Sequence, residues 1–237
     1  MIEKIRLQQS CIEQSLNHIH VELDSASKVI SSAVLNGGMV KANHLLNLHV
    51  NKNRTPTELP DEFITKYASN LNLKGAVVGM MTAAYMDTFR LVKESMQGVE
   101  ISVLVTCGLS NARRVGDRAE YRVMAAQEEE IGTINIIVLT SAILTDAAMV
   151  EALMIATEAK TAALQETAVL SPVSNKIATG TGTDAIAVVS GQGPELVAYC
   201  GKHVLFGETL GSLVFDAVKE SIKSNLNNIN GTTPRSS

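Results

Sequence analysis

The strongest constraint on the fold of this chain is a set of four short apolar runs. They occupy residues 75–83, 99–107, 131–139 and 185–189. Runs of this length are typical of strands that are buried within a sheet. None of them approaches the ~20 apolar residues that a membrane-spanning helix requires. We therefore expect a buried sheet in a protein that does not insert into a membrane.

Turn residues and alternation predict further strands. Residues 28–35 favour a strand, and the Asn36-Gly37-Gly38 sequence that follows favours a tight turn, because asparagine and glycine tolerate positive φ. Between positions 40 and 50 apolar and polar residues alternate, which is the period of a strand. The polar face of this strand carries Asn43, Asn47 and His49. The other predicted strands are 88–93 and 196–200, and the predicted connections are 51–62 and 108–130.

Three segments have the spacing of helices: residues 1–17, 146–168 and 208–228. The second is the clearest, because it is rich in alanine and Thr145 or Asp146 fits its N-cap. The pattern as a whole predicts one α/β domain of the α+β type over residues 1–226. Its mixed, mostly antiparallel sheet of about seven or eight strands would be packed by the two long C-terminal helices. The polar tail, 227–237, is predicted to be disordered.

Composition excludes several classes of protein. The 237 residues include 20 basic and 24 acidic residues, and the net charge of −4 argues against nucleic acid as a partner. Aromatic residues make up only 3%, too few for a base-stacking surface. Three cysteines without CxxC spacing favour reduced thiols in a cytoplasmic protein. The histidines lack HExxH spacing, so we expect no structural zinc and assign no metal ligands, which leaves only a weak metal site open.

One segment, Thr179-Gly180-Thr181-Gly182-Thr183-Asp184, favours a ligand site. If it is extended, the three threonine hydroxyls lie on one face and the glycines on the other. It lacks the lysine of a P-loop, and it precedes a strand, whereas a dinucleotide fingerprint follows one. The alternative is an ordinary glycine-rich turn.

Lys160 falls in the middle of the apolar face of the helix at 146–168. A lysine at such a position must extend to solvent, pair with a carboxylate or face a ligand. Asp184 is the candidate partner. Periodicity alone leaves structural pairing and a role in the site equally open.

Other polar residues lie at strand ends or helix starts. Ser110 and Asn111 follow a buried strand, but without the GxSxG pattern of a serine hydrolase. Asn135 lies inside an apolar strand, so its amide must be hydrogen-bonded; it either orients a carbonyl or ties backbone together. His203 precedes the last helix and is a candidate acid or base. Glu208, in the first turn of that helix, complements the helix dipole.

Taken together, several segments resemble one family, the adenosylcobinamide amidohydrolases of corrinoid salvage. The likeness covers roughly residues 20–220 and leaves out the N-terminal segment and the tail. The segments that carry it are 31–33 through 36–38, Asn47, 79–83, 108–112 with Arg114, Gly116 and Asp117, 132–136, 157–165, 178–184, Gly201, His203 and 207–208.

The resemblance implies hydrolysis of the amide that joins the aminopropanol arm to the corrin ring side chain of adenosylcobinamide. The products would be adenosylcobyric acid and 1-amino-2-propanol. The corrinoid is then a small-molecule substrate, and no cofactor is implied. A homo-oligomer is compatible with this function. The alternative from another class is a carrier that binds a corrinoid or nucleotide and returns it intact.

We hypothesise that His203 or Asp184 activates water or a hydroxyl, while Lys160 and Asn135 stabilise the oxyanion or orient the amide. Ser110 or a threonine is the alternative, as a covalent nucleophile. The residues expected to bind substrate are Asn36, Asn47, Ser110, Asn111, Thr133, Thr179, Thr181, Thr183 and Glu208.

Overall fold

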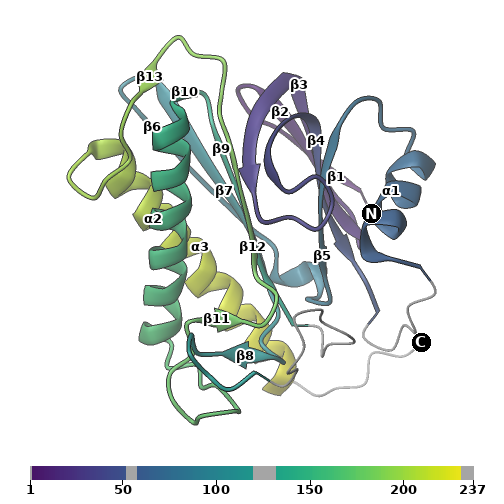
Figure 1. The fold of residues 1–237 in the computed structure, drawn as a ribbon, viewed down its shortest axis with the longest axis vertical. Coiled ribbons are helices and arrows are strands. Elements are labelled where there is room, and N and C mark those ends of the chain that lie inside the picture. The colour runs from purple at the N-terminus through teal and green to yellow at the C-terminus, as the bar shows by residue number, and fades with distance from the viewer. Residues whose placement is uncertain (1, 52–57, 120–131, 231–237) are drawn as a thin grey trace.

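The computed structural model describes residues 2–51, 58–119 and 132–230 (Figure 1). The helices are α1 (Pro60–Asn70), α2 (Asp146–Glu166) and α3 (Leu205–Asn230), with a 3-10 turn, η1 (Met86–Thr88). The strands are β1 (Glu3–Arg6), β2 (Ser10–Gln14), β3 (His18–Ser31), β4 (Gly38–His49), β5 (Val77–Thr82), β6 (Arg90–Met96), β7 (Val99–Cys107), β8 (Ala112–Arg113), β9 (Ile134–Thr140), β10 (Ile143–Leu144), β11 (Gly180–Thr181), β12 (Ala185–Val189) and β13 (Leu196–Val197). Among these residues no helix is long and apolar enough to span a membrane.

The predicted fold class is confirmed. The main sheet has nine strands, in the order β1-β2-β3-β12-β9-β7-β6, with β4 paired to β3 and β5 paired to β4. Only the β12–β9 and β4–β5 pairs in it are parallel. The sheet therefore is mixed and mostly antiparallel, as the sequence predicts.

The long strand β3 makes this sheet curl. On one edge its first half pairs with β2, and its last residues, Val29–Ser31, pair with β12. On its other edge β4 pairs along the whole length, across a register shift between Glu22 and Ser27. An irregularity of this kind bends a strand and increases its twist. The bend lets β4 and β5 fold over against β12, β9 and β7.

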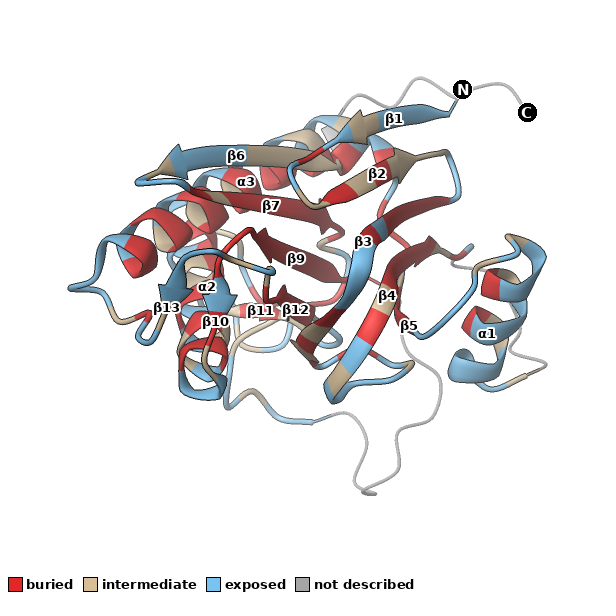
Figure 2. Cartoon of the chain, turned by 90° about the horizontal axis from the view of Figure 1, so that it is seen from above, coloured by how far each residue is buried: buried red, intermediate tan, exposed pale blue. Residues whose placement is uncertain are grey.

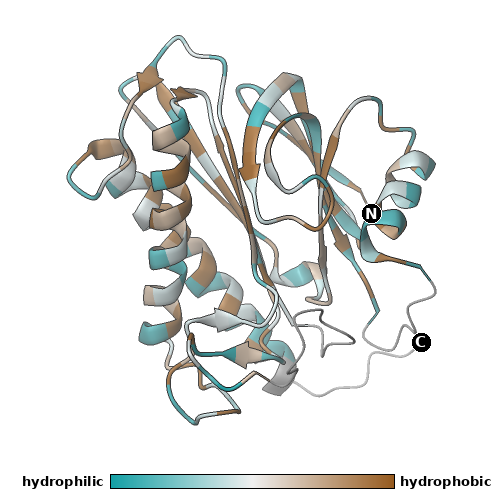
Figure 3. Cartoon of the chain, in the orientation of Figure 1, coloured by the Kyte–Doolittle hydropathy of each residue, from teal (hydrophilic) through white to brown (hydrophobic). Residues whose placement is uncertain are grey.

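Three clusters of buried side chains separate four layers. The first fills the space between α2, α3 and one face of β7, β9 and β12. The second lies between the opposite face of these strands and β4–β5, and the third lies under α1. Figure 2 shows the buried central strands, and Figure 3 shows how apolar residues concentrate on them. Alternate residues of β9 thus face different cores: Ile134 and Ile136 face the helices, while Ile137 faces β4–β5.

Local sequence signals account for several elements. The side chain of Thr145 caps α2 by accepting a hydrogen bond from the backbone N of Ala148 at 3.1 Å. Asn36 and Gly38 have φ angles of 54° and 87° in the turn between β3 and β4. The predicted strands 99–107 and 185–189 coincide with β7 and β12.

The prediction of an N-terminal helix is wrong. Residues 3–14 form the antiparallel pair β1–β2, in which Ile5 lies opposite Ile12. Ile12 is fully buried in the second core cluster. Pairing of β2 with β3 supplies backbone partners and a core contact that local periodicity does not reveal, and tertiary context of this kind overrides propensity.

Several boundaries also differ from the prediction. Strand β3 begins at His18 rather than at residue 28, and β13 ends at Val197 rather than at residue 200. The predicted loop at 51–62 contains the start of α1, where Pro60 occupies the first turn, a position that suits proline because its missing N–H is not needed there. Helix α3 extends to Asn230, so residues 227–230 of the predicted tail are helical. The rest of that tail, 231–237, and residues 120–131 of the predicted connection lie outside the described residues.

Two buried histidines form a pair on the outer face of the β3–β4 hairpin. His20 Nε2 lies 3.1 Å from His44 Nδ1, and His44 Nε2 lies 2.9 Å from the carbonyl oxygen of Lys74. A carbonyl oxygen only accepts, so His44 carries its proton on Nε2 and accepts from His20. Burial, with His44 as a further cause, lowers the pKa of His20 to about 4.

We therefore predict that the protein loses stability as the pH falls from about 6.5 to about 4, because of His20. Between about pH 6.5 and pH 4 the unfolded state binds a proton at His20 and the folded state does not, so the free energy of unfolding should fall by on the order of 3 kcal/mol. Urea titrations across this range measure it. His20→Gln should flatten the slope, and an equally steep slope in that variant would contradict the assignment.

Candidate active site

A buried ion pair joins α2 to the segment before β12 on the helix side of the sheet. Lys160 is 7% exposed, and its Nζ donates a hydrogen bond to Oδ2 of Asp184. The partner suggested by the sequence is thus confirmed. The pair lies on the same face as Ile134 and Ile136, since Ala185, the next residue, faces the other way.

Both carboxylate oxygens of Asp184 accept hydrogen bonds from groups of this chain. Oδ1 accepts from the backbone N of Ile134 at 3.0 Å and from Thr181 Oγ1 at 2.5 Å. Oδ2 accepts from the backbone N of Thr181 at 3.1 Å, besides Lys160. A carboxylate has about four acceptor sites, so all of them are occupied. Asp184 therefore ties the start of β9 and the end of β11 to α2.

Gly180 makes this ion pair possible. A Cβ placed on Gly180 would lie 2.3 Å from Asp184 Oδ2 and 2.9 Å from Lys160 Nζ. Real Cβ atoms do not approach an oxygen so closely, so only glycine lets the backbone of β11 pass the pair. The glycine that suggested close approach of a ligand in fact admits two side chains of this chain.

The threonine hydroxyls of this segment do not form the predicted single face. Only Gly180–Thr181 is extended, and residues 182–183 form a turn. Thr179 Oγ1 accepts from the backbone N of Val115 at 2.8 Å, and Thr181 donates to Asp184. The Thr183 hydroxyl bonds that of Thr133. Each hydroxyl thus has a partner within the chain, and only Thr183 and Thr133 lie together.

A chain of amides lies on the other face of the sheet, between its two layers. Asn135 Nδ2 donates to Asn47 Oδ1 at 2.7 Å and to the carbonyl oxygen of Met81 at 2.9 Å. Asn47 Nδ2 in turn donates to Thr106 Oγ1 at 2.8 Å. β4, β5, β7 and β9 are therefore linked at the end where β7 stops and β9 begins. The structure separates Asn135 from Lys160 and Asp184, which face the helices.

Two loops meet beside this amide chain. A Cβ on Gly132 would lie 2.5 Å from Ser110 Oγ and 2.8 Å from Asn111 Oδ1, so the loops before β9 and after β7 touch. The backbone N of Gly182 donates to the carbonyl oxygen of Asn111 at 3.2 Å. The structure thus brings together, at one end of the sheet, the predicted residues Asn47, Ser110, Asn111, Thr133, Asn135 and Thr183.

Two buried acceptors at this end lack a partner among the residues that the structure describes. They are Oδ1 of Asn135 and Oδ1 of Asn111. A buried polar atom without a hydrogen bond is costly, by about 1–3 kcal/mol. Both atoms could accept an N–H or O–H of a bound molecule, and this is the strongest local sign of a ligand site.

Three predicted residues lie elsewhere. Asn36 sits in the β3–β4 turn, at the opposite end of β4 from Asn47, and donates to the carbonyl oxygen of Val77 at 2.8 Å. His203 is exposed just before α3, and Glu208 is exposed in its first turn. Figure 1 places the start of α3 far from β8 and β11. No contact within the described residues joins these three to the amide chain.

Sequence reasoning missed Thr82 and Thr106, two fully buried hydroxyls at the same end of the sheet. Thr106 accepts from Asn47, and Thr82 Oγ1 accepts from the backbone N of Ala84 at 3.0 Å. The available signal was strand alternation, because a threonine on the face opposite a core-facing valine, as in Val105-Thr106, points into the space between the layers.

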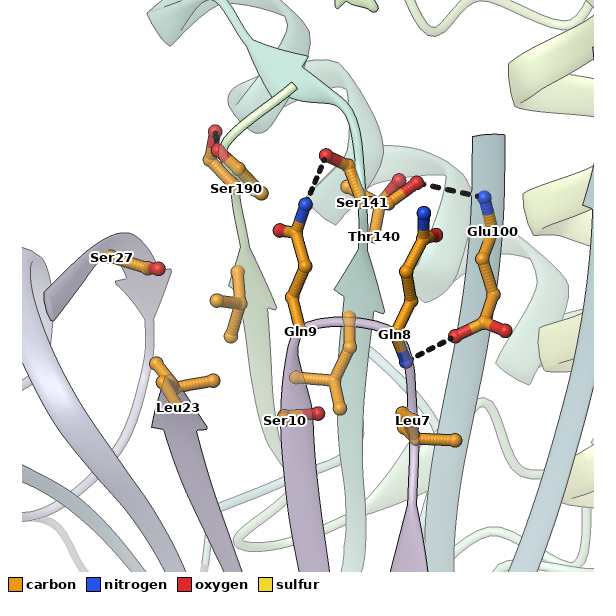
Figure 4. Close-up of a pocket in the computed structure, with 13 residues that line it drawn as sticks. Leu7, Gln8, Gln9, Ser10, Leu23, Ser27, Glu100, Thr140, Ser141 and Ser190 are labelled. Carbon is orange, nitrogen blue, oxygen red and sulfur yellow. Dashed lines mark hydrogen bonds between the residues drawn. The ribbon is translucent and has the colours of Figure 1, made fainter. Parts of the chain in front are cut away.

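Two hollows in the described structure lie away from the amide chain. Figure 4 shows one near Gln9, Ser141 and Ser190, at the end of β9 remote from Asn135. Its volume is about 20 Å³, room for about one water molecule. A shallow groove of about 390 Å³ between α2 and α3 includes Glu158, Lys202 and Glu208. Its charged rim is an ion pair of Glu158 with Lys202.

Comparison with known proteins gives one family. The family model of adenosylcobinamide amidohydrolases matches residues 2–230, a match that includes the N-terminal residues left out of the resemblance. An adenosylcobinamide amidohydrolase of Methanosarcina mazei is 29% identical over 201 residues, which are 81% of this chain and 88% of that protein. An uncharacterised protein of Methanocaldococcus jannaschii is 38% identical over 157 residues, 60% of this chain and 61% of that protein. The match thus spans about three-fifths of that second relative.

Solved structures show weaker likeness. A β-aminopeptidase of Burkholderia sp. has a TM-score of 0.44 and 11% identity, and the match covers 92% of this chain and 79% of that one. The PH0078 protein of Pyrococcus horikoshii has a TM-score of 0.40 and 11% identity, covering 95% and 83%. Likeness at this level carries no argument about function.

The buried ion pair should show strong coupling in stability measurements. Removing one partner leaves an uncompensated buried charge, so Lys160→Met or Asp184→Asn should each lower the free energy of unfolding by about 3–5 kcal/mol. The double variant should lose clearly less than the sum of the two. Urea unfolding of all four proteins measures the coupling, and additive losses would show that the pair is not coupled.

Gly180→Ala should disturb the same pair by steric overlap, at a cost of about 1–3 kcal/mol. Gly201→Ala is the matched control, because a Cβ there meets no atom within 4 Å. Its effect should stay within about 0.5 kcal/mol. Thermal unfolding compares the two variants. Equal stability of both would mean that β11 does not need glycine beside Asp184.

Proposed function

Because the chain belongs to the adenosylcobinamide amidohydrolase family, we propose that it hydrolyses the amide between the aminopropanol arm and the corrin ring side chain of adenosylcobinamide. The products are adenosylcobyric acid and 1-amino-2-propanol, in the salvage of a cobalamin precursor. The single observation that carries the proposal is the family match over residues 2–230. The three free cysteines suit a reducing, cytoplasmic setting.

The amide-lined end of the sheet supports this function. Amide hydrolysis requires a polarised carbonyl, an activated water or hydroxyl, and a proton for the leaving amine. Asn47, Asn135 and the loop residues Ser110 and Asn111 supply several hydrogen-bonding groups in one place, two of them with open acceptors. We place the scissile amide at this end, between the two layers of the sheet.

The hydrogen-bond pattern supports a specific role for Asn135 in this proposal. Both hydrogens of its Nδ2 are already donated, to Asn47 and to the carbonyl oxygen of Met81. Of the two roles that the sequence left open for Asn135, this pattern supports orienting the amide over stabilising an oxyanion by donation. Its open Oδ1 accepts the N–H of the substrate amide and so fixes which face of the carbonyl is attacked.

In this proposal Lys160 and Asp184 do not contact the substrate but hold the segments that do. Their pair fixes the start of β9 through the Ile134 backbone and the turn through Thr181. Thr133 directly precedes Ile134, and Thr183 lies two residues after Thr181. The pair thus positions the loops that contact substrate.

Incubation of the purified chain with adenosylcobinamide should release 1-amino-2-propanol, detected by mass analysis together with adenosylcobyric acid. Asn135→Ala should lower kcat/KM at least tenfold, since it removes a hydrogen bond in a buried site. Lys41→Ala, at an exposed position of β4, is the control that should keep parent activity. Adenosylcobinamide returned intact but bound would instead indicate a carrier.

The same assay separates the roles of the other predicted residues. Lys160→Ala and Asp184→Asn should reduce activity in parallel with stability, because they act by positioning. His203→Ala tests the exposed histidine before α3. Folded variants of Asn135, Asp184 and Lys160 that all turn over at the parent rate would overturn the placement of the site.

A further inference from the structure

His49 is held at the same end of the sheet as the amide chain. It is the last residue of β4 and lies opposite Thr82 of β5. Asn47, two residues earlier, points between the layers, and strand geometry places His49 on that same side. Its ring is half-buried. The imidazole therefore lies on the face of β4 that carries Asn47, the hydrogen-bond partner of Asn135.

One hydrogen bond fixes the tautomer of this ring. His49 Nδ1 lies 2.9 Å from the carbonyl oxygen of Ala84. A carbonyl oxygen only accepts, so Nδ1 carries the proton and Nε2 of the neutral ring presents a lone pair. Within the described residues nothing bonds Nε2. The ring of Tyr85 stacks on the imidazole, at 6.3 Å between centroids and 27° between planes, and so fixes its plane.

The end of β5 and the residues after it connect His49 to Asn135. The carbonyl oxygen of Met81 accepts from Asn135, and that of Ala84, three residues on, accepts from His49. Ala84 also packs on the loop after β7: a Cβ on Gly108 would lie 3.3 Å from Ala84 Cβ and 3.4 Å from the backbone N of Thr133. His49 and Asn135 are therefore both held by the short segment from Met81 to Ala84.

The other histidines are placed differently. His20 and His44 bond each other on the outer face, and His18 Nδ1 lies 3.0 Å from the Tyr67 hydroxyl of α1. His203 is exposed before α3. Asp184, the other predicted base, has its acceptor sites filled. Among the groups named so far, His49 combines a fixed ring, an unused basic nitrogen and a place beside the amide cluster.

We propose that His49 is the catalytic acid–base of the amide hydrolysis, an inference that rests on the proposed function. Nε2 takes a proton from water as the water oxygen bonds to the amide carbonyl carbon. The imidazolium then gives this proton to the amide nitrogen as the C–N bond breaks. The amine leaves, and the new carboxyl group loses its proton, so the products are a carboxylate and a protonated amine. Ala84 stabilises the imidazolium through Nδ1–H.

Two variants of His49 test the base directly. Asparagine places an amide nitrogen near Nδ1 and keeps the bond to Ala84, but it has no basic nitrogen. Glutamine reaches the position of Nε2 but is not basic either. General acid–base catalysis contributes about 10²–10⁴-fold, so H49N and H49Q should each lower kcat for adenosylcobinamide by at least ~100-fold. KM should change by only a few-fold, because substrate binding does not need the proton.

Chemical rescue gives a second readout that a structural role would not produce. H49A leaves a half-exposed cavity, and added imidazole should restore part of its turnover in proportion to its concentration. Thermal unfolding of each variant shows that the fold is kept. Parent-like kcat in folded H49N, or H49A that imidazole does not restore, overturns the assignment. A parent protein that leaves adenosylcobinamide intact contradicts the proposed function itself, and with it the role of His49.

Discussion

Backbone pairing along β3 is the constraint on which the rest of the structure depends. One strand of 14 residues serves β2 and β12 on one edge and β4 on the other. Buried backbone groups must be hydrogen-bonded, so separating β3 from any of these strands would cost free energy. The resulting bend brings β4 and β5 over β9 and β7. Without it, Asn47 and Asn135 would not meet.

The two faces of the central strands carry different kinds of polar group: a buried ion pair on one face and neutral amides on the other. On the helix face a buried lysine and aspartate neutralise each other and anchor three segments through one carboxylate. A buried pair of this kind adds little net stability, but losing one partner is costly. On the opposite face neutral amides and hydroxyls keep open hydrogen-bonding capacity. Anchoring on one face thus holds the backbone that positions hydrogen-bonding groups on the other.

How far the sequence predicted this arrangement depends on the range of the interaction. Helical periodicity placed Lys160 on the buried face of α2, and the structure confirms Asp184 as its partner. Strand alternation placed Asn47 and His49 on one face of β4. The bond between Asn47 and Asn135 joins residues 88 apart in the chain, and no local pattern encodes such a pairing. The N-terminal strands were missed for the same reason, because their pairing with β3, rather than their own periodicity, decides their structure.

The central claim is that this chain hydrolyses the amide of a corrinoid side chain at the amide-lined end of the sheet. The most direct measurement is the mass of the corrinoid product after incubation of adenosylcobinamide with the purified chain in oxygen-18 water. We expect adenosylcobyric acid that carries one labelled oxygen in its new carboxylate, and unlabelled 1-amino-2-propanol. Unlabelled, intact adenosylcobinamide after prolonged incubation with the folded protein would contradict it.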